Sequence, residues 1–210
     1  MVEALRRLAS RRVEGLDQLS DAELVELCKK ELPSDLTAYR ELLIRYEGLV
    51  FNTCAKIIGS KQDAEEVAQD AMIQVFHKIH QFEGRSAFKT WLYKIVHNYC
   101  RNRISKLARK REKTQEYQEM KLKSEPDVDA IDPNMESLSE QVQEAMMKMK
   151  DKEREVLVMK FTTGMTIQEI SDVLEIGLSA AKMRLYRSLE SFKEFYQKVD
   201  KNSLTTPLTA

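Results

Sequence analysis

The sequence is poor in the residues that interrupt helices, with six glycines and four prolines among 210 residues. Sheets and barrels usually need more turn residues, so this scarcity favours helices. Cysteines are also few, and Cys28, Cys54 and Cys100 are odd in number and widely spaced. This excludes a disulfide framework and fits a reducing compartment. No apolar run approaches membrane-spanning length and no signal peptide is visible, so we expect a cytoplasmic protein without membrane insertion.

Common enzyme motifs are absent as well. The sequence contains no phosphate-binding loop, no HExxH, no nucleophile elbow and no Gly-rich dinucleotide turn. We therefore expect no catalysis, no cofactor and no small-molecule substrate. The pairs His77/His80 and His97/Cys100 have the spacing of two zinc half-sites. Both pairs fall on expected helices whose apolar stripes already fill a core, so we expect no metal. The alternative is a metal-dependent enzyme, which a metal assay on the purified protein would test.

Charge is balanced overall but unevenly distributed. The chain has 34 Lys and Arg against 34 Asp and Glu, giving a formal net charge of zero. Basic residues are concentrated between Arg85 and Lys113, and acidic residues between Glu116 and Glu136. Adjacent blocks of opposite sign indicate a basic nucleic-acid footprint beside an acidic linker.

Helical periodicity and capping patterns predict an all-α protein with two small helical domains joined by a flexible linker. The first domain contains four helices, with a capping box at Ser20 and Glu23, a break at Pro33, and starts near Asp63 and Ser86. The expected divisions are an N-terminal tail (1–19), the first domain (20–111), an acidic linker (112–136), the second domain (137–198) and a disordered tail (199–210).

The strongest local pattern is a helix-turn-helix between Thr166 and Arg187. Thr166 and Glu169 form a capping box, a turn with Gly177 follows, and Ser179 is expected to cap the second helix. Thr166 lies where backbone amides can meet a phosphate. The outer face of the second helix suits the DNA major groove. That face carries Lys182, Met183, Tyr186 and Arg187, with Arg184 at its flank.

The third helix has an unusual outer face for a solvated surface. Acidic and amide side chains surround the apolar Ile73. Taken alone, charged and amide residues favour a solvated face, and the functional alternative is a docking surface for a basic or polar partner with Ile73 as the apolar contact. The loop and helix that follow mix aromatic, amide and cationic residues, as suits single-stranded DNA. The residues expected to face outward there are Phe82, Tyr93, Lys94, His97, Asn98, Arg101 and Asn102. Trp91 falls on the apolar stripe and is expected in the core.

Four segments together resemble the extracytoplasmic-function (ECF) sigma factors, the minimal group of bacterial sigma factors. They are SDAELV from Ser20, DAEEVAQD from Asp63, FEGRSAFKTWLYKI from Phe82 and AKMRLYRS from Ala181. Their order and spacing resemble the family from about Leu19 to Lys198. Two departures stand out: the joint from Cys28 to Leu36 is longer than usual, and Ser-Ala-Ala at 179–181 replaces a frequent Gly-Thr-Val.

The resemblance implies partners and site residues. It implies binding to core RNA polymerase, at the β′ clamp helices and the β flap, with docking through Asp63, Glu66, Gln69, Asp70, Ile73 and Gln74. It implies that the first domain recognises the minus-ten promoter element, with Phe82 and Asn98 holding a flipped base and Tyr93, Lys94, Arg101 and Asn102 nearby. The second domain is expected to recognise the minus-thirty-five element through Thr166, Ser179, Lys182, Met183, Arg184, Tyr186 and Arg187. An anti-sigma factor is a further expected partner.

An alternative remains open at this level. A DNA-binding regulator that does not use polymerase would also carry a helix-turn-helix. Such a protein needs neither the acidic third helix nor the basic fourth, and it usually needs a dimer face to bind two half-sites. Binding to core polymerase distinguishes the two.

Overall fold

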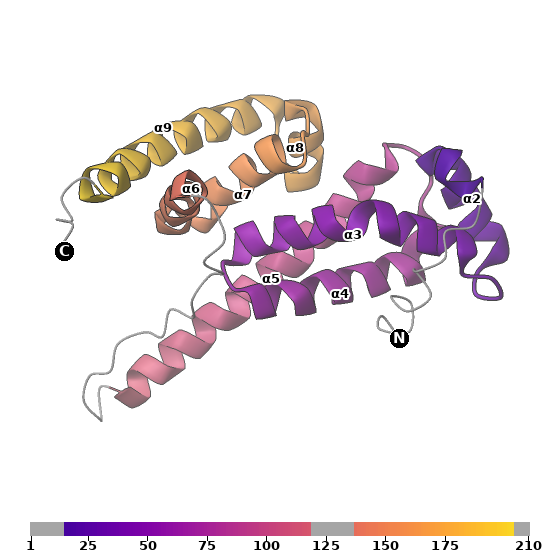
Figure 1. Cartoon of the computed structure of the whole chain (residues 1–210), viewed down its shortest axis with the longest axis horizontal. Helices are drawn as coiled ribbons and strands as arrows, with labels where there is room; N and C mark the ends of the chain where they lie inside the picture. The colour runs from indigo at the N-terminus through magenta and orange to yellow at the C-terminus, as the bar shows by residue number, and fades with distance from the viewer. Residues whose placement is uncertain (1–14, 119–136, 204–210) are drawn as a thin grey trace.

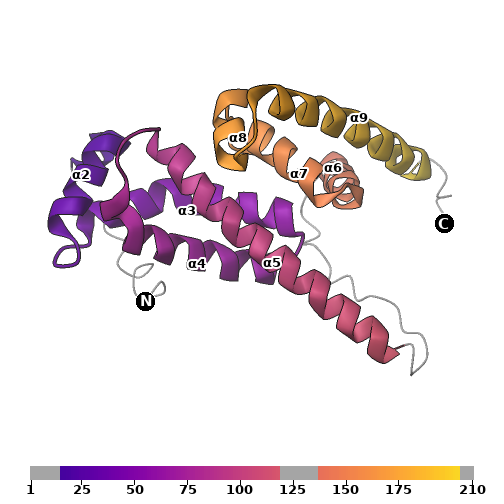
Figure 2. The same cartoon turned by 180° about the vertical axis from the view of Figure 1, so that it is seen from behind.

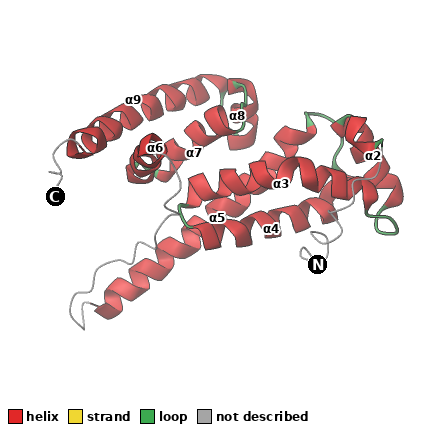
Figure 3. Ribbon diagram, in the orientation of Figure 1, coloured by secondary structure: helices red, strands yellow, loops and turns green. Residues whose placement is uncertain are grey.

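The computed structural model describes residues 15–118 and 137–203, and these form helices without strands (Figures 1 and 3). The first unit contains α2 (Asp21–Glu31), α3 (Thr37–Ile58), α4 (Lys61–Lys78) and α5 (Phe88–Gln118), with short turns η1 (Leu16–Gln18) and η2 (Ile79–Gln81). The second contains α6 (Ser137–Lys148), α7 (Asp151–Leu157), the π-helical turn η3 (Val158–Thr162), α8 (Ile167–Leu174) and α9 (Leu178–Ser203). The predicted all-α, two-domain class is confirmed. No helix in the described part is both long and apolar enough to cross a membrane.

The predicted capping boxes are confirmed at two helix starts. At α2, the Ser20 backbone N–H donates to Glu23 at 2.7 Å, and the Glu23 N–H donates to the Ser20 hydroxyl at 3.3 Å. At α8, Thr166 and Glu169 make the same reciprocal pair at 2.8 and 3.2 Å. Each box satisfies N–H groups that have no partner within the helix.

Three other predicted helix starts are wrong by one to three residues. Helix α4 is capped by Ser60, which accepts from the Asp63 N–H, so Asp63 lies inside the first turn. The Ser86 hydroxyl donates to the Ala87 carbonyl instead of capping, and α5 begins at Phe88. Helix α9 begins at Leu178, which places Ser179 inside its first turn. Ser and Asp favour both caps and first turns, so the pattern alone does not separate them.

The predicted linker and tails are shorter than expected. Helix α5 continues through 112–118, where Glu, Lys and Gln are good helix formers and no Gly or Pro intervenes; residues 119–136 lie outside the described part. Helix α9 continues to Ser203, beyond the predicted end at Lys198, and 204–210 lie outside the described part. Residues 1–14 also lie outside it.

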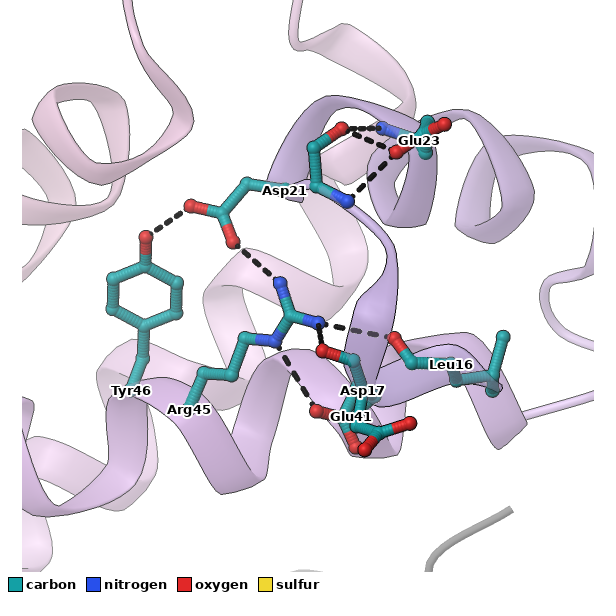
Figure 4. Close-up of polar contacts among 8 residues, drawn as sticks. Leu16, Asp17, Asp21, Glu23, Glu41, Arg45 and Tyr46 are labelled. Carbon is teal, nitrogen blue, oxygen red and sulfur yellow. Dashed lines mark hydrogen bonds and ion pairs between the residues drawn. The ribbon is translucent and has the colours of Figure 1, made fainter. Parts of the chain in front are cut away.

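The last residues of the predicted N-terminal tail pack onto the first unit (Figure 4). The Arg45 guanidinium donates to the carbonyls of Leu16 and Asp17 at 3.0 and 3.1 Å, and it pairs with Asp21 and Glu41, each at 3.1 Å. One arginine therefore joins η1, the start of α2 and α3.

The two units pack against each other. Figures 1 and 2 show α7 and α8 beside α3 and α5, and one hydrophobic core extends through both units. Arg154, almost completely buried, donates from Nε to the Ile57 carbonyl at 2.9 Å across this boundary. Nothing in the sequence indicates this contact beyond the two charged residues, Arg154 and Glu155, directly before the apolar run at 156–159.

Candidate nucleic-acid and polymerase interfaces

The outer face of α4 carries the predicted docking residues. Glu66 and Asp70 are exposed, whereas Asp63, Gln69, Ile73 and Gln74 are half-buried. The apolar stripe behind them is buried as predicted, from Ala64 to Val75. The structure therefore places all six residues on the side of α4 away from the core, with Ile73 as a partly exposed apolar group among polar ones.

Part of this face is held by α5. Arg103 pairs with Asp63 and with Glu66, the latter at 2.5 Å, and the Tyr99 hydroxyl donates to Gln74 at 3.4 Å. Hydrogen bonding to Asp63 raises the pKa of Arg103, so its charge is retained. Asp70 has no such neighbour among the described residues, which leaves its carboxylate available to a partner.

Helix α5 presents a polar face at helical spacing. Asn98, Arg101 and Asn102 are exposed, and Lys94 is half-buried one turn before Asn98. These four residues lie on one side of the helix, because positions three and four apart are neighbours on its surface. Four of the six residues expected at the minus-ten surface therefore share one face of α5, and their contact with DNA stays a prediction.

Three residues predicted to face outward from the same region do not. Phe82 is buried, with its ring centroid 5.8 Å from that of Phe88 and 5.3 Å from that of Trp91. Tyr93 and His97 are also buried. The prediction of outward orientation is wrong for Phe82, Tyr93 and His97. It failed for Phe82 because this loop residue packs against Phe88 and Trp91. It failed for Tyr93 and His97 because α5 contacts α3 and α4 as well as the second unit, so its buried arc is wider than one apolar stripe.

The proposed zinc pairs do not come together. His77 and His80 are exposed on the first unit, while His97 contacts Glu155 and the Cys100 sulfur lies 3.6 Å from that of Cys54. Within residues 15–118 and 137–203, no three His, Cys, Asp or Glu side chains are grouped to hold a metal ion.

The helix-turn-helix has the predicted geometry. The turn after α8 places Glu175 in the left-handed conformation (φ 55°), and the Ser171 hydroxyl donates to the Ile176 carbonyl at 2.6 Å. Ala181 and Leu185 are buried against the unit. The opposite face of α9 carries the predicted contact residues, of which Lys182, Met183, Tyr186 and Arg187 are exposed and Arg184 is half-buried. Thr166 and Ser179 are exposed at the starts of α8 and α9.

The two candidate DNA surfaces adjoin in this arrangement. Lys94 of the α5 surface pairs with Glu175 of the helix-turn-helix turn at 2.6 Å. Thr90 donates to Glu169 at 2.9 Å, and Lys89 donates to the Thr163 carbonyl. Hydrogen bonding to Lys94 lowers the pKa of Glu175, so this pair is charged at neutral pH.

Family comparisons bear on both units. The model of Sigma-70 region 2 matches residues 42–110, and the model of Sigma-70 region 4 matches residues 139–192. The chain belongs to the sigma-70 family, as a sigma factor of the ECF group. Among its relatives, the ECF RNA polymerase sigma factor SigW of Bacillus subtilis strain 168 is 26% identical over 179 residues, covering 79% of this chain and 92% of SigW. The ECF RNA polymerase sigma-E factor of Escherichia coli K12 is 27% identical over 194 residues, which cover 83% of this chain and 93% of the sigma-E factor.

Two solved structures share the fold of this sigma factor. The first is CnrH in complex with the cytosolic domain of CnrY, with a TM-score of 0.59 and 18% identity over 85% of this chain and 97% of CnrH. The second is the sigma factor RpoE in complex with the anti-sigma factor NepR from Bartonella quintana, with a TM-score of 0.59 and 17% identity over 76% of this chain and 96% of that one. Sigma factors are transcription initiation factors, which agrees with a role other than catalysis.

Proposed function

We propose that this sigma factor binds core RNA polymerase through the outer face of α4. It then directs the enzyme to promoters through α5 at the minus-ten element and α9 at the minus-thirty-five element. The observation that carries the proposal is the presence, in one chain, of cationic surfaces on α5 and α9 together with an acidic face of α4. On that face Asp70 is exposed and Ile73 is half-buried. A regulator that works without polymerase has no use for the docking face.

The α5 surface suits the unpaired strand of an opening promoter. Asn98 and Asn102 offer amide groups to base edges, and Lys94 and Arg101 offer positive charge to the backbone. Phe82 and Tyr93 are buried in this arrangement, and the Phe82 ring packs against Phe88 and Trp91.

The α9 surface suits the major groove. Lys182 and Arg187 reach guanine edges or phosphates, and the exposed Met183 and Tyr186 side chains can contact thymine methyl groups. The two surfaces cannot both occupy a promoter in the packed arrangement. Elements at minus ten and minus thirty-five lie about 25 base pairs apart, which is about 85 Å of B-form DNA at about 3.4 Å per base pair. Promoter binding therefore requires the two units to separate.

The decisive experiment measures complex formation with purified bacterial core polymerase. Asp70→Lys and Ile73→Glu should each abolish tight binding, whereas Glu190→Lys, an acid-to-lysine change at an exposed position of α9, should not. No binding by the wild type, with affinity for duplex DNA retained, would instead identify a regulator that works alone.

An anti-sigma factor completes the proposed set of partners, and the proposed site of action is the cytoplasm. Support comes from the relative RpoE, solved with the anti-sigma factor NepR, and from the exposed apolar side chains Phe161, Met183 and Tyr186 on the second unit. Purification of the native protein from its own cells should yield a second small protein besides polymerase. Recovery of the sigma factor with polymerase alone counts against this partner.

A further inference from the structure

A cavity of about 700 Å³ lies where α5, the start of α7 and the start of α9 meet. Its wall is built from both units of the protein. Five cationic side chains line it: Arg101 of α5, Lys150 and Lys152 at the start of α7, and Arg184 and Arg187 of α9. The cavity therefore combines one residue of the candidate minus-ten surface, Arg101, with three of the candidate minus-thirty-five surface, Met183, Arg184 and Arg187.

Cations outnumber carboxylates on this wall. In the described ranges, none of the five cations forms an ion pair or side-chain hydrogen bond. The wall also has three carboxylates, and each is engaged elsewhere. They are Asp151, paired with Arg154 at 2.5 Å, Glu153, which accepts from Ser191 at 3.0 Å, and Glu155, which contacts His97 at 3.2 Å. Packing of the two units thus adds Arg101 to four cations of the second unit, and the five cations outnumber the three carboxylates of the wall.

The size and lining of the cavity define the ligand that it fits. Its volume lies within the range of small-molecule sites. Three arginines offer planar donor groups that match phosphate oxygens, and two lysines add positive charge. Ile104, Ala180 and Met183 supply an apolar part of the wall, against which a nucleoside can pack. We propose that this cavity binds a nucleotide that carries two or more phosphates.

Binding at this site is coupled to the arrangement of the units. The cavity exists only while α5 lies against α7 and α9, so a ligand that bridges Arg101 and Arg184 favours the packed arrangement over the separated one. If the proposed promoter function holds, the ligand also competes with DNA for Arg101, Arg184 and Arg187. That consequence rests on the proposed function, whereas the binding site itself does not.

Calorimetric titration of the full chain with ADP tests the site without polymerase or promoter. Inorganic tripolyphosphate and uncharged adenosine are the comparison ligands. ADP should bind with a stoichiometry of one, tripolyphosphate should compete, and adenosine should bind far more weakly. Lys152→Glu and Arg184→Glu should each weaken ADP binding by about tenfold or more, because each replaces a phosphate partner with a repelling charge. Lys193→Glu makes the same charge change at an exposed position of α9 outside the cavity and should leave affinity unchanged.

A second variant separates the junction site from general attraction to α9. His97→Glu places a carboxylate against Glu155 at the buried boundary, and His97 is not itself a residue of the cavity wall. ADP should bind this variant about tenfold or more weakly, because the wall is no longer assembled. Equal affinity for His97→Glu and the wild type, equal losses for Arg184→Glu and Lys193→Glu, or no heat at millimolar ADP would each overturn the proposal. Tighter binding of single-stranded DNA than of ADP, lost in the same variants, would assign the cavity to nucleic acid instead. A failure to bind core polymerase would leave all these outcomes unaffected and would refute only the proposed function.

Discussion

The imidazole Nε2 of His97 lies 3.2 Å from a carboxylate oxygen of Glu155, and this contact crosses the boundary between the two helical units. Both side chains are buried. The other ring nitrogen of His97, Nδ1, is buried without a hydrogen-bond partner. A buried polar atom without a hydrogen-bond partner costs free energy. This cost offsets part of the stability that the His97–Glu155 contact contributes to the packing of the two units.

His97→Glu should separate the two units. Two facing carboxylates at a buried position repel each other, and we expect the packed arrangement to lose about 3 kcal/mol or more. Small-angle X-ray scattering should show a larger radius of gyration, while far-UV circular dichroism should show unchanged helix content. His80→Glu makes the same substitution at an exposed position of the first unit and should change neither measurement. An unchanged radius for His97→Glu would show that the contact does not hold the units together.

Glu169 should make the stability of the second unit dependent on acidic pH. Hydrogen bonding to the Thr166 backbone lowers the pKa of Glu169 below its ordinary value of 4.5. A carboxyl whose pKa is lowered by folding contributes stability that is complete above about pH 4.5 and is lost as pH falls through the folded-state pKa. Chemical unfolding of wild type and Glu169→Gln at several pH values should give curves that differ at neutral pH and converge in acid.

The other capping box supplies a comparison for α8. Thr166→Ala and Ser20→Ala remove equivalent cap hydroxyls, and each should lower the free energy of unfolding by about 1 kcal/mol. The Glu169 carboxylate also accepts from Thr90 across the boundary, whereas the Ser20 box has no contact of that kind. Thr166→Ala should therefore also increase hydrogen exchange at the boundary, measured at α5 amides near Thr90. Equal exchange in both variants would contradict the link between cap and boundary.

Arg45→Lys should loosen the N-terminal turn from the first unit. A lysine ammonium cannot reproduce the planar donor set that binds Leu16, Asp17, Asp21 and Glu41 together (Figure 4). We expect a loss of about 1–2 kcal/mol of unfolding free energy, with faster hydrogen exchange at residues 16–19. Arg85→Lys is the matched control, since Arg85 is highly exposed and pairs only with the exposed Glu83.

Substitutions on α9 should separate base contacts from phosphate contacts. Arg187→Ala and Lys182→Ala should each weaken binding to minus-thirty-five DNA, by about 1–3 kcal/mol where the side chain contacts a base edge. If the side chain contacts a base edge, the substitution weakens binding to the original site but not to a site in which that one base pair is altered. A phosphate contact gives an equal loss on all sequences and a smaller salt dependence. Glu194→Ala, at an exposed position farther along α9, should leave binding unchanged.

The sequence by itself determined the helices, because their signals are local. The capping boxes at Ser20 and Thr166, the scarcity of Gly and Pro, and the apolar stripes of α4 and α9 each depend on neighbours within a few residues. The same locality places Asp70 and Ile73 on one face, and Lys182, Tyr186 and Arg187 on another. The family resemblance follows from these segments and their order.

Only the tertiary structure decided which faces of α5 are covered, by the other helices of the first unit or by the second unit. Tyr93 and His97 carry polar atoms and lie outside the predicted apolar stripe, yet both are buried, and His97 contacts Glu155 of the second unit. The pairing of Lys94 with Glu175 and the convergence of Arg101 with Arg184 likewise join residues more than 80 positions apart. The periodicity of apolar residues predicts which face of a single helix packs against a single core. The packing of two units creates a second boundary, which no local pattern along the chain specifies.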